Sequence, residues 1–269
     1  MNRSEKPPHP DQFLDRSEIS GSEEISTNSE IHRRSELAAA CRLAYQFKWN
    51  RSVLNHVAAR SLERPDHFLM NPVGLLWAEI VSSDFVLCDL NGGFSQSGKY
   101  FPGPAGLSFH SAIFRANPDI SCSFHLHPKE CVALASIQSD LAFITQDSLM
   151  LYDQIAYHEF EGPADEPQEG EKIAALAQGK LCVMMRNHGV LTIGRSVAEA
   201  FYAMQIVIDT CAIQLSAMST GAPLRRIPQD VCELSAEKFK RRRMKQPFGK
   251  SAWDACYRML ERENPVFKN

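Results

Sequence analysis

Two closely spaced histidines in the segment CSFHLHP are the first residues of this chain that could do chemistry. His125 and His127 stand at the end of an apolar run, and a proline follows them. Side chains two residues apart in a strand point to the same side. Both imidazoles would therefore face one way where the strand ends. Such a pair is typical either of two ligands to a metal ion or of a solvated strand end.

A third histidine has similar surroundings. His188, in the segment MMRNHGVLTIG, ends another apolar run and precedes a glycine, which lets other groups approach closely. Three neutral imidazoles on strand ends would give a divalent cation three ligands and leave positions open for a substrate. The spacing alone is also compatible with ordinary surface or core histidines.

The elements that must position these histidines alternate along the chain. We expect strands at 67–72, 84–90, 121–127, 141–146 and 180–189, with 190–194 continuing after the last of them. We expect helices at 35–49, 106–117, 128–137, 169–180 and 196–221, and two more near 229–243 and 250–262. Interleaved strands and helices predict an α/β fold, a single three-layer domain whose central mixed or antiparallel sheet is covered by helices.

The domain boundaries follow from composition. Residues 1–30 are rich in Ser, Glu, Pro and Asn without a hydrophobic period, which predicts a disordered arm. Residues 31–269 then form one domain with a C-terminal helical extension. Its 196–221 helix, with a capping box of Ser196 and Glu199, is apolar almost all round. Such a helix is buried inside the domain or against another subunit, so we expect a homo-oligomer.

Composition excludes several classes of partner. The chain has 269 residues, of which 44% are hydrophobic and 23% charged, and its net charge of −3 gives no pull towards nucleic acid or anionic lipid. The basic stretch 237–245 lacks the aromatic and glycine pattern of a nucleic-acid module, and we interpret it as an exposed helix face. No apolar run approaches the roughly 18 residues of a membrane span.

The N-terminal residues and the cysteines indicate the cellular compartment in which we expect this protein. The N-terminal residues lack the apolar core of an export signal. The eight cysteines form no CxxC pair and mostly lie in apolar segments, as reduced core cysteines do. We therefore expect a cytoplasmic protein that binds a small-molecule substrate and neither nucleic acid nor membrane.

Several longer segments resemble one protein family. FHLHPKECVALAS, RNHGVLTIGRSVAEAFYAMQIVIDTCAIQ and LSFHSAIFRANPDI are similar, in order and spacing, to blocks of the class II aldolase/adducin family. DHFLMNPVGLLWAEI and ITQDSLMLYDQIAYHEF are similar to its adducin-like bacterial branch. The resemblance covers the chain from about residue 35 to about residue 225.

The resemblance implies a metal site. His125 and His127 match the HxH motif of the family and His188 matches its NHG motif. In the family's enzymes these residues bind a divalent ion that polarises a substrate carbonyl. The resemblance favours zinc here, with iron(II) or manganese as alternatives. It also implies a tetramer with sites between subunits, in which Tyr157 matches a proton-donating tyrosine from the neighbouring subunit. The alternative for Tyr157 is an interface or core aromatic.

This chain departs from the sugar-phosphate aldolases of the family at two places. Their Ser-Ser-Glu segment matches Pro104, Ala105 and Gly106, so the catalytic glutamate is missing. Their phosphate-binding Thr-Gly and Asn-Val pairs match Val73-Gly74 and His56-Val57, which leaves His56 and Gly74 as the substrate-binding candidates. We therefore expect no sugar-phosphate aldolase, and spare volume beside Gly106.

Three functions from different classes fit these residues. The first is a divalent-metal-dependent lyase that acts on a small non-phosphorylated oxo or hydroxy acid by aldol cleavage or decarboxylation. The second is a non-haem iron oxygenase that decarboxylates an aromatic 2-oxo acid, with dioxygen using the room left at Gly106. The third is a non-catalytic, adducin-like oligomerising protein. The three histidines rank the enzymes above the scaffold, because a scaffold has no reason to keep them.

Overall fold

The computed structural model describes residues 29–95, 98–162 and 167–269. Of the arm expected at 1–30, only Ser29 and Glu30 lie within the described residues. The first helix, α1 (Glu30–Gln46), begins at Glu30, and the Ser29 hydroxyl caps it by accepting the N–H of His32 at 3.1 Å.

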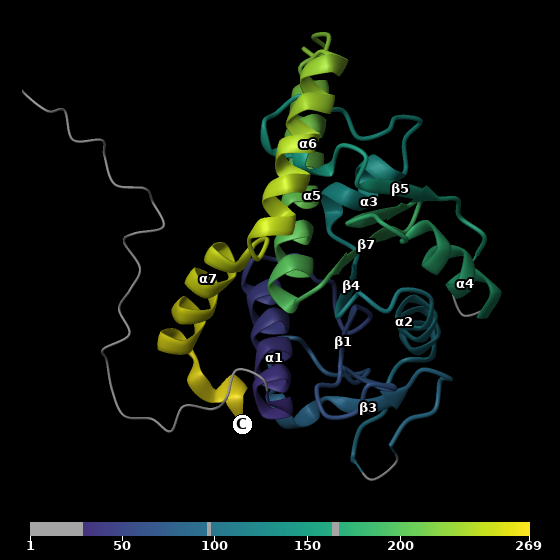
Figure 1. The fold of residues 1–269 in the computed structure, drawn as a ribbon, viewed down its shortest axis with the longest axis vertical. Coiled ribbons are helices and arrows are strands. Elements are labelled where there is room, and N and C mark those ends of the chain that lie inside the picture. Colours follow the sequence, from purple (N-terminus) through teal and green to yellow (C-terminus); the bar gives the residue numbers. More distant parts are fainter. Residues whose placement is uncertain (1–28, 96–97, 163–166) are drawn as a thin grey trace, which may run out of the picture.

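A seven-stranded sheet in the order β3-β2-β1-β4-β7-β6-β5 forms the centre of the molecule (Figure 1). Its strands are β1 (His56–Arg60), β2 (His67–Met70), β3 (Val86–Asp89), β4 (Cys122–Leu126), β5 (Ile155–His158), β6 (Cys182–Met185) and β7 (Gly189–Gly194). Only β5 and β6 pair in parallel, and the other neighbours are antiparallel. The expected mixed sheet is confirmed.

Helices cover both faces of this sheet (Figure 1). One apolar cluster joins alternate strand residues to α2 (Pro104–Ala116) and α4 (Pro167–Leu176). The other cluster joins the opposite strand residues to α1, α3 (Lys129–Ala135) and α5 (Val197–Met218). Along β4, Phe124 and Leu126 face the α5 side, so Ser123 and His125 face the α2 side. The three-layer α/β architecture is therefore confirmed.

The C-terminal extension consists of α6 (Gln229–Lys245) and α7 (Lys250–Glu263), followed by a short 3-10 helix at Pro265–Lys268. Trp253 of α7 is buried against Phe201 of α5, with their ring centroids 5.2 Å apart. Arg243 of α6 turns inward and pairs with the buried carboxylate of Glu199 at 2.5 Å. Most other basic side chains of 237–245 are exposed, as expected of an outer helix face.

The expected strand at 141–146 is absent, and neither β1 nor β5 was foreseen. The N–H groups of Leu141 and Ala142 donate to the side chains of Tyr157 and Gln214, at 3.0 and 2.7 Å, so they do not pair with a neighbouring strand. β1 lies near the middle of the sheet, between β2 and β4. Its sequence HVAAR contains two alanines, which have low strand propensity, so the sequence pattern is weak.

The long helix α5 is a core helix. Its length and hydropathy alone would allow it to cross a membrane, contrary to the expectation that no segment of the chain is so apolar. Here half of its most apolar 18-residue window is buried by the domain, including Phe201, Met204 and Cys211. All eight cysteines are free thiols, as expected of reduced core residues.

The cap of α5 gives a first testable prediction. The Ser196 hydroxyl accepts the N–H of Glu199 at 3.1 Å, whereas the Glu199 carboxylate accepts the N–H of Arg195, so half of the expected capping box forms. We expect Ser196→Ala to lower the free energy of unfolding by about 1 kcal/mol. Urea unfolding measures this, with Ser216→Ala on the exposed side of the same helix as the control. Equal stability of the two variants would contradict this role of the cap.

Candidate metal centre

Three histidine side chains meet where β4 ends. The Nε2 atom of His125 lies 2.8 Å from Nε2 of His127 and 3.3 Å from Nε2 of His188. The ligand nitrogens of all three lie within 4.8 Å of one another. A tetrahedral ion with N–Zn distances of 2.0–2.1 Å holds its nitrogens about 3.3 Å apart, so the three imidazoles fit a shared cation. The structure thus brings together the three residues predicted to bind metal.

Local backbone geometry brings His188 to the HxH pair. His188 lies in the tight connection between β6 and β7, where its N–H donates to the Met185 carbonyl at 3.2 Å. Gly189 follows, and a Cβ at this position would lie 2.6 Å from Cδ2 of His127 and 2.6 Å from the Leu126 carbonyl. Only glycine permits this close approach of the two chain segments.

Burial keeps these imidazoles neutral. It lowers the pKa of His127 to about 4 and the pKa values of His125 and His188 below their usual range. A neutral imidazole offers a lone pair to a cation. With Nε2 as the ligand atom, His125 carries its proton on Nδ1, which is buried without a partner among the described residues.

The three histidines open on a cavity of about 250 Å³ whose wall is mostly apolar. Its lining comprises Val53, Leu54, Asn55, His56, Met70, Asn71, Pro72, Val73, Gly103, Pro104, Ala105, Gly106, Phe109 and the three histidines. His56, a predicted substrate-binding residue, lies beside His125, with ring centroids 4.9 Å apart. Gly74 has a φ of 89° and does not line the cavity, although the neighbouring Val73 does.

Gly106 lines the cavity of about 250 Å³, so the expected free volume lies beside it, but the direction in which its own side chain would extend is blocked. A Cβ on Gly106 would lie 2.2 Å from Cε of Met70 and 2.8 Å from Cγ of His56. Both side chains point from the sheet towards the first turn of α2 and fill the space. The free volume beside Gly106 therefore lies in the cavity and not along its Cβ direction.

Tyr157 lies outside this cavity within one chain. Its hydroxyl oxygen accepts the N–H of Leu141 at 3.0 Å, and the Arg186 guanidinium lies 4.4 Å from the centre of its ring. Burial raises the pKa of Tyr157 to about 12. Its role as a proton donor to a neighbouring subunit stays a prediction. The next residue, His158, faces inward and bonds the buried Glu169 at 3.1 Å.

Two further candidate residues, His110 and Ser123, were not identified from the sequence. His110 of α2 is fully buried and lies within hydrogen-bond distance of both His56 and Ser123, at 2.9 and 2.6 Å. The sequence holds one signal for this contact, because Ser123 precedes His125 by two residues and so shares its face of β4. Nothing in the spacing indicates His110, which reads as an ordinary residue of an apolar helix.

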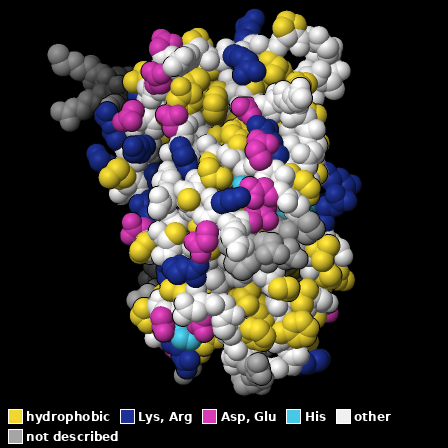
Figure 2. Space-filling view, turned by 90° about the vertical axis from the view of Figure 1, so that its right-hand side faces the viewer, with side chains coloured by type: hydrophobic (Ala, Val, Ile, Leu, Met, Phe, Trp, Pro, Cys, Tyr) yellow, Lys and Arg dark blue, Asp and Glu magenta, His cyan; other side chains and the backbone are white. Residues whose placement is uncertain are grey.

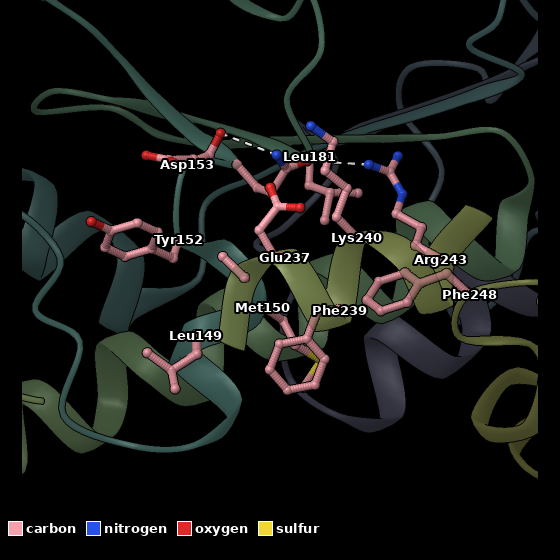
Figure 3. Close-up of a pocket in the computed structure, with 12 residues that line it drawn as sticks. Leu149, Met150, Tyr152, Asp153, Leu181, Glu237, Phe239, Lys240, Arg243 and Phe248 are labelled. Carbon is pink, nitrogen blue, oxygen red and sulfur yellow. Dashed lines mark hydrogen bonds between the residues drawn. The ribbon is translucent and has the colours of Figure 1, made fainter. Parts of the chain in front are cut away.

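Elsewhere in residues 29–95, 98–162 and 167–269, no other histidine, cysteine and carboxylate side chains converge in this way. The cavity in Figure 3, between α6 and the 3-10 helix Asp147–Leu151, measures about 70 Å³, and Arg243 at its edge already donates to Gln154 at 3.2 Å. That volume suits about two water molecules. On the face shown in Figure 2, acidic and basic side chains are interspersed, which agrees with the small net charge.

Fold and site together define a class: α/β proteins in which a seven-stranded sheet carries three histidines that converge on a cation site. Residues 35–215 match the family model described as Class II Aldolase and Adducin N-terminal domain. The chain therefore belongs to the class II aldolase/adducin family, as its sequence motifs indicated.

Both a bacterial protein with an aldolase name and a mammalian adducin are similar to this chain. A Caulobacter vibrioides protein named for aldolase class 2 is 34% identical over 241 residues, which are 90% of this chain and 93% of its own. Alpha-adducin of Mus musculus is 34% identical over 77% of this chain, and the match spans 29% of adducin.

Solved structures agree with the fold. An aldolase II superfamily protein from Pseudomonas syringae has a TM-score of 0.81 and 32% identity, over 90% of this chain and 96% of its own. An L-fuculose 1-phosphate aldolase from Glaciozyma antarctica has a TM-score of 0.76 over 89% of this chain and 93% of its own. At 23% identity, the second likeness concerns the fold alone.

Proposed function

We propose that this protein is a divalent-metal-dependent carbon–carbon lyase that acts on a small non-phosphorylated oxo or hydroxy acid, by aldol cleavage or decarboxylation. The convergence of three neutral imidazoles at the wall of a cavity carries this proposal. A divalent cation held by them, with zinc first and iron(II) or manganese as alternatives, would polarise a substrate carbonyl as a Lewis acid.

The rest of the cavity supports an unphosphorylated substrate. A phosphate dianion needs several hydroxyl, N–H or cationic donors. The residues at the matching positions, Val73, Pro104 and Ala105, line the cavity and offer no side-chain donor. His56 supplies a polar group beside the three histidines, and the rest of the wall is mostly apolar.

The other two functions are weaker. The cavity leaves room for dioxygen beside Gly106, but the three converging ligands are all imidazoles, whereas non-haem iron(II) oxygenases typically use two histidines and one carboxylate. A scaffold of the adducin kind would need no cation, yet the three ligand nitrogens converge within 4.8 Å. Both remain as outcomes of the experiment that follows.

Turnover assays test the proposed reaction. Freshly purified protein, supplied with zinc, manganese or iron(II), is incubated with oxo and hydroxy acids under nitrogen and under air. We expect carbon–carbon cleavage that needs no dioxygen, and no turnover of fuculose 1-phosphate or ribulose 5-phosphate. Cleavage that occurs only in air would favour the oxygenase. A protein that binds no metal and cleaves no substrate would favour the scaffold. Robust cleavage of either sugar phosphate would overturn the substrate assignment.

We also propose that the protein works as a homo-oligomer, with a tetramer as the first candidate. Leu54, at the cavity, is 67% exposed, and Phe101, whose carbonyl accepts the N–H of Val73, is 58% exposed. A neighbouring subunit that covers these side chains could bring its Tyr157 to the substrate. Sedimentation at micromolar concentration is expected to give a multiple of the 30.2 kDa chain mass. A monomer would contradict the proposal and remove the role of Tyr157 in a neighbouring site.

A further inference from the structure

Three hydrogen-bonded side chains lead from the protein interior to the cavity. Ser123 Oγ lies 2.6 Å from Nδ1 of His110, and Nε2 of His110 lies 2.9 Å from Nδ1 of His56. Ser123 and His110 are 0% exposed, so no solvent interrupts the chain. His56, at its end, lines the cavity beside the metal ligand His125.

The direction of these hydrogen bonds follows from the serine. A hydroxyl carries one proton to donate, and a buried hydroxyl must donate it to an acceptor. Among the described residues, the only hydrogen-bond partner of the Ser123 hydroxyl is Nδ1 of His110. Ser123 therefore donates to His110, and Nδ1 of His110 carries no proton.

The same reasoning extends to His56. Burial lowers the pKa of His110 to about 3, so His110 is a neutral imidazole with its single proton on Nε2. That N–H donates to Nδ1 of His56, which leaves the proton of a neutral His56 on its own Nε2. Nε2 of His56 has no hydrogen-bond partner among the described residues. Unlike Nδ1 of His125, it is not completely buried.

We propose that His56 is a fixed hydrogen-bond donor to a substrate oxygen in this site, and that Ser123 and His110 are positioning residues that hold it in the Nε2–H tautomer. The identity of the substrate oxygen rests on the proposed lyase function. The tautomer does not, because it follows from the contacts within the chain.

The His56 ring lies beside Gly106, the position matched to the glutamate of the sugar-phosphate aldolases. The His56 ring approaches within 2.8 Å of the point where a side chain on Gly106 would begin. A carboxylate there would accept a proton, whereas the Nε2–H group can only donate. A fixed donor stabilises the negative charge that develops on a carbonyl oxygen when a carbon–carbon bond beside it breaks. In this site His56 would thus supply an oxyanion-stabilising donor and no proton acceptor.

Nitrogen NMR tests the tautomer directly. The full chain, labelled with ¹⁵N-histidine and studied with and without zinc, gives proton–nitrogen correlations that distinguish Nε2–H from Nδ1–H imidazoles. His56→Gln and His110→Gln identify the two signals. We expect both residues to show the Nε2–H pattern. A proton on Nδ1 of His56, or on both of its nitrogens, would overturn the inference.

Ser123 provides the matched pair of variants. Ser123→Ala removes the hydroxyl that fixes His110, so we expect His56 and His110 to lose their single tautomer. Ser123→Thr keeps the hydroxyl and should keep the tautomer. Unchanged tautomers in Ser123→Ala would remove the positioning role. Because these spectra contain no substrate, a failure to find turnover would refute the proposed reaction and leave the tautomer result intact.

Turnover then tests the donor role itself. His56→Gln keeps an N–H donor, whereas His56→Glu is a similar-sized acceptor. We expect the glutamate variant to lose about 10²–10³-fold in kcat, as removal of one oxyanion donor does, with a smaller change in KM. The glutamine variant should lose less than the glutamate variant, because it keeps an N–H donor. Equal losses, or a glutamate variant as active as the native protein, would overturn the donor role.

Discussion

Replacement of His188 by alanine is expected to weaken zinc binding by about 100-fold or more. The reasoning starts from structural zinc sites, where four ligands together contribute roughly 10–16 kcal/mol, or about 3 kcal/mol for each. His188 supplies one of three converging nitrogens, and no other described histidine, cysteine or carboxylate joins that group. His125→Ala and His127→Ala should have similar effects. Competition with a chromophoric chelator measures the three affinities.

His67 offers the matched control for this experiment. It lies on β2, is partly exposed and bonds Asp66 at 2.8 Å, so it does not line the cavity. His67→Ala should bind zinc as the native protein does and should keep any turnover. If the alanine variants at 67 and 188 had the same affinity, the three-histidine site would not be the zinc site.

Gly106→Ala is expected to lower the free energy of unfolding by about 1–3 kcal/mol, as overpacking of a core position does. The added methyl group would meet Met70 and His56, whose nearest atoms lie 2.2 and 2.8 Å away. The Met70 terminus can move, but His56 is held by its contact with His110 at 2.9 Å. Gly106→Glu would displace His56 further, so it should create no aldolase activity. Denaturant unfolding measures the effect on stability.

Gly103 and Met70 provide the controls for Gly106. Gly103→Ala adds the same methyl group three residues earlier, where its nearest neighbour would be Val73 at an ordinary 3.8 Å, so we expect a change below about 0.5 kcal/mol. Combining Gly106→Ala with Met70→Ala should cost less than the sum of the single changes, because the clash is relieved. Strict additivity, or equal stability of the alanine variants at 103 and 106, would contradict the packing described for this wall.

The convergence of the three histidines could be predicted from the sequence because it depends on short, local patterns. The period of two in a strand places His125 and His127 on one side, and apolar runs before both His127 and His188 mark strand ends. The family motifs then indicate that these ends meet. In the structure they meet through Gly189, which allows the backbone of one segment to touch the other.

The remaining features depend on contacts that no local pattern records. The segment 141–146 has the composition of a strand, yet the side chains of Tyr157 and Gln214 take its first N–H groups. β1 forms from a weakly patterned segment because β2 and β4 pair with it on both sides.

The hydrogen-bonded chain behind the site is another feature of this kind. His110 becomes part of it only because α2 packs on the face of β4 that carries Ser123. The same packing explains why the Cβ direction of Gly106 is blocked, since the two side chains that fill it come from β1 and β2.

The most direct test of the central claim is X-ray absorption spectroscopy of the protein after saturation with zinc, together with its metal content. The three-histidine centre predicts about one ion per chain, with three imidazole nitrogens in its first shell at about 2.0–2.1 Å. The His188→Ala variant should lose the ion or one of these nitrogens. A native protein that takes up no stoichiometric divalent metal, or one whose bound ion shows no imidazole shell, would contradict the account.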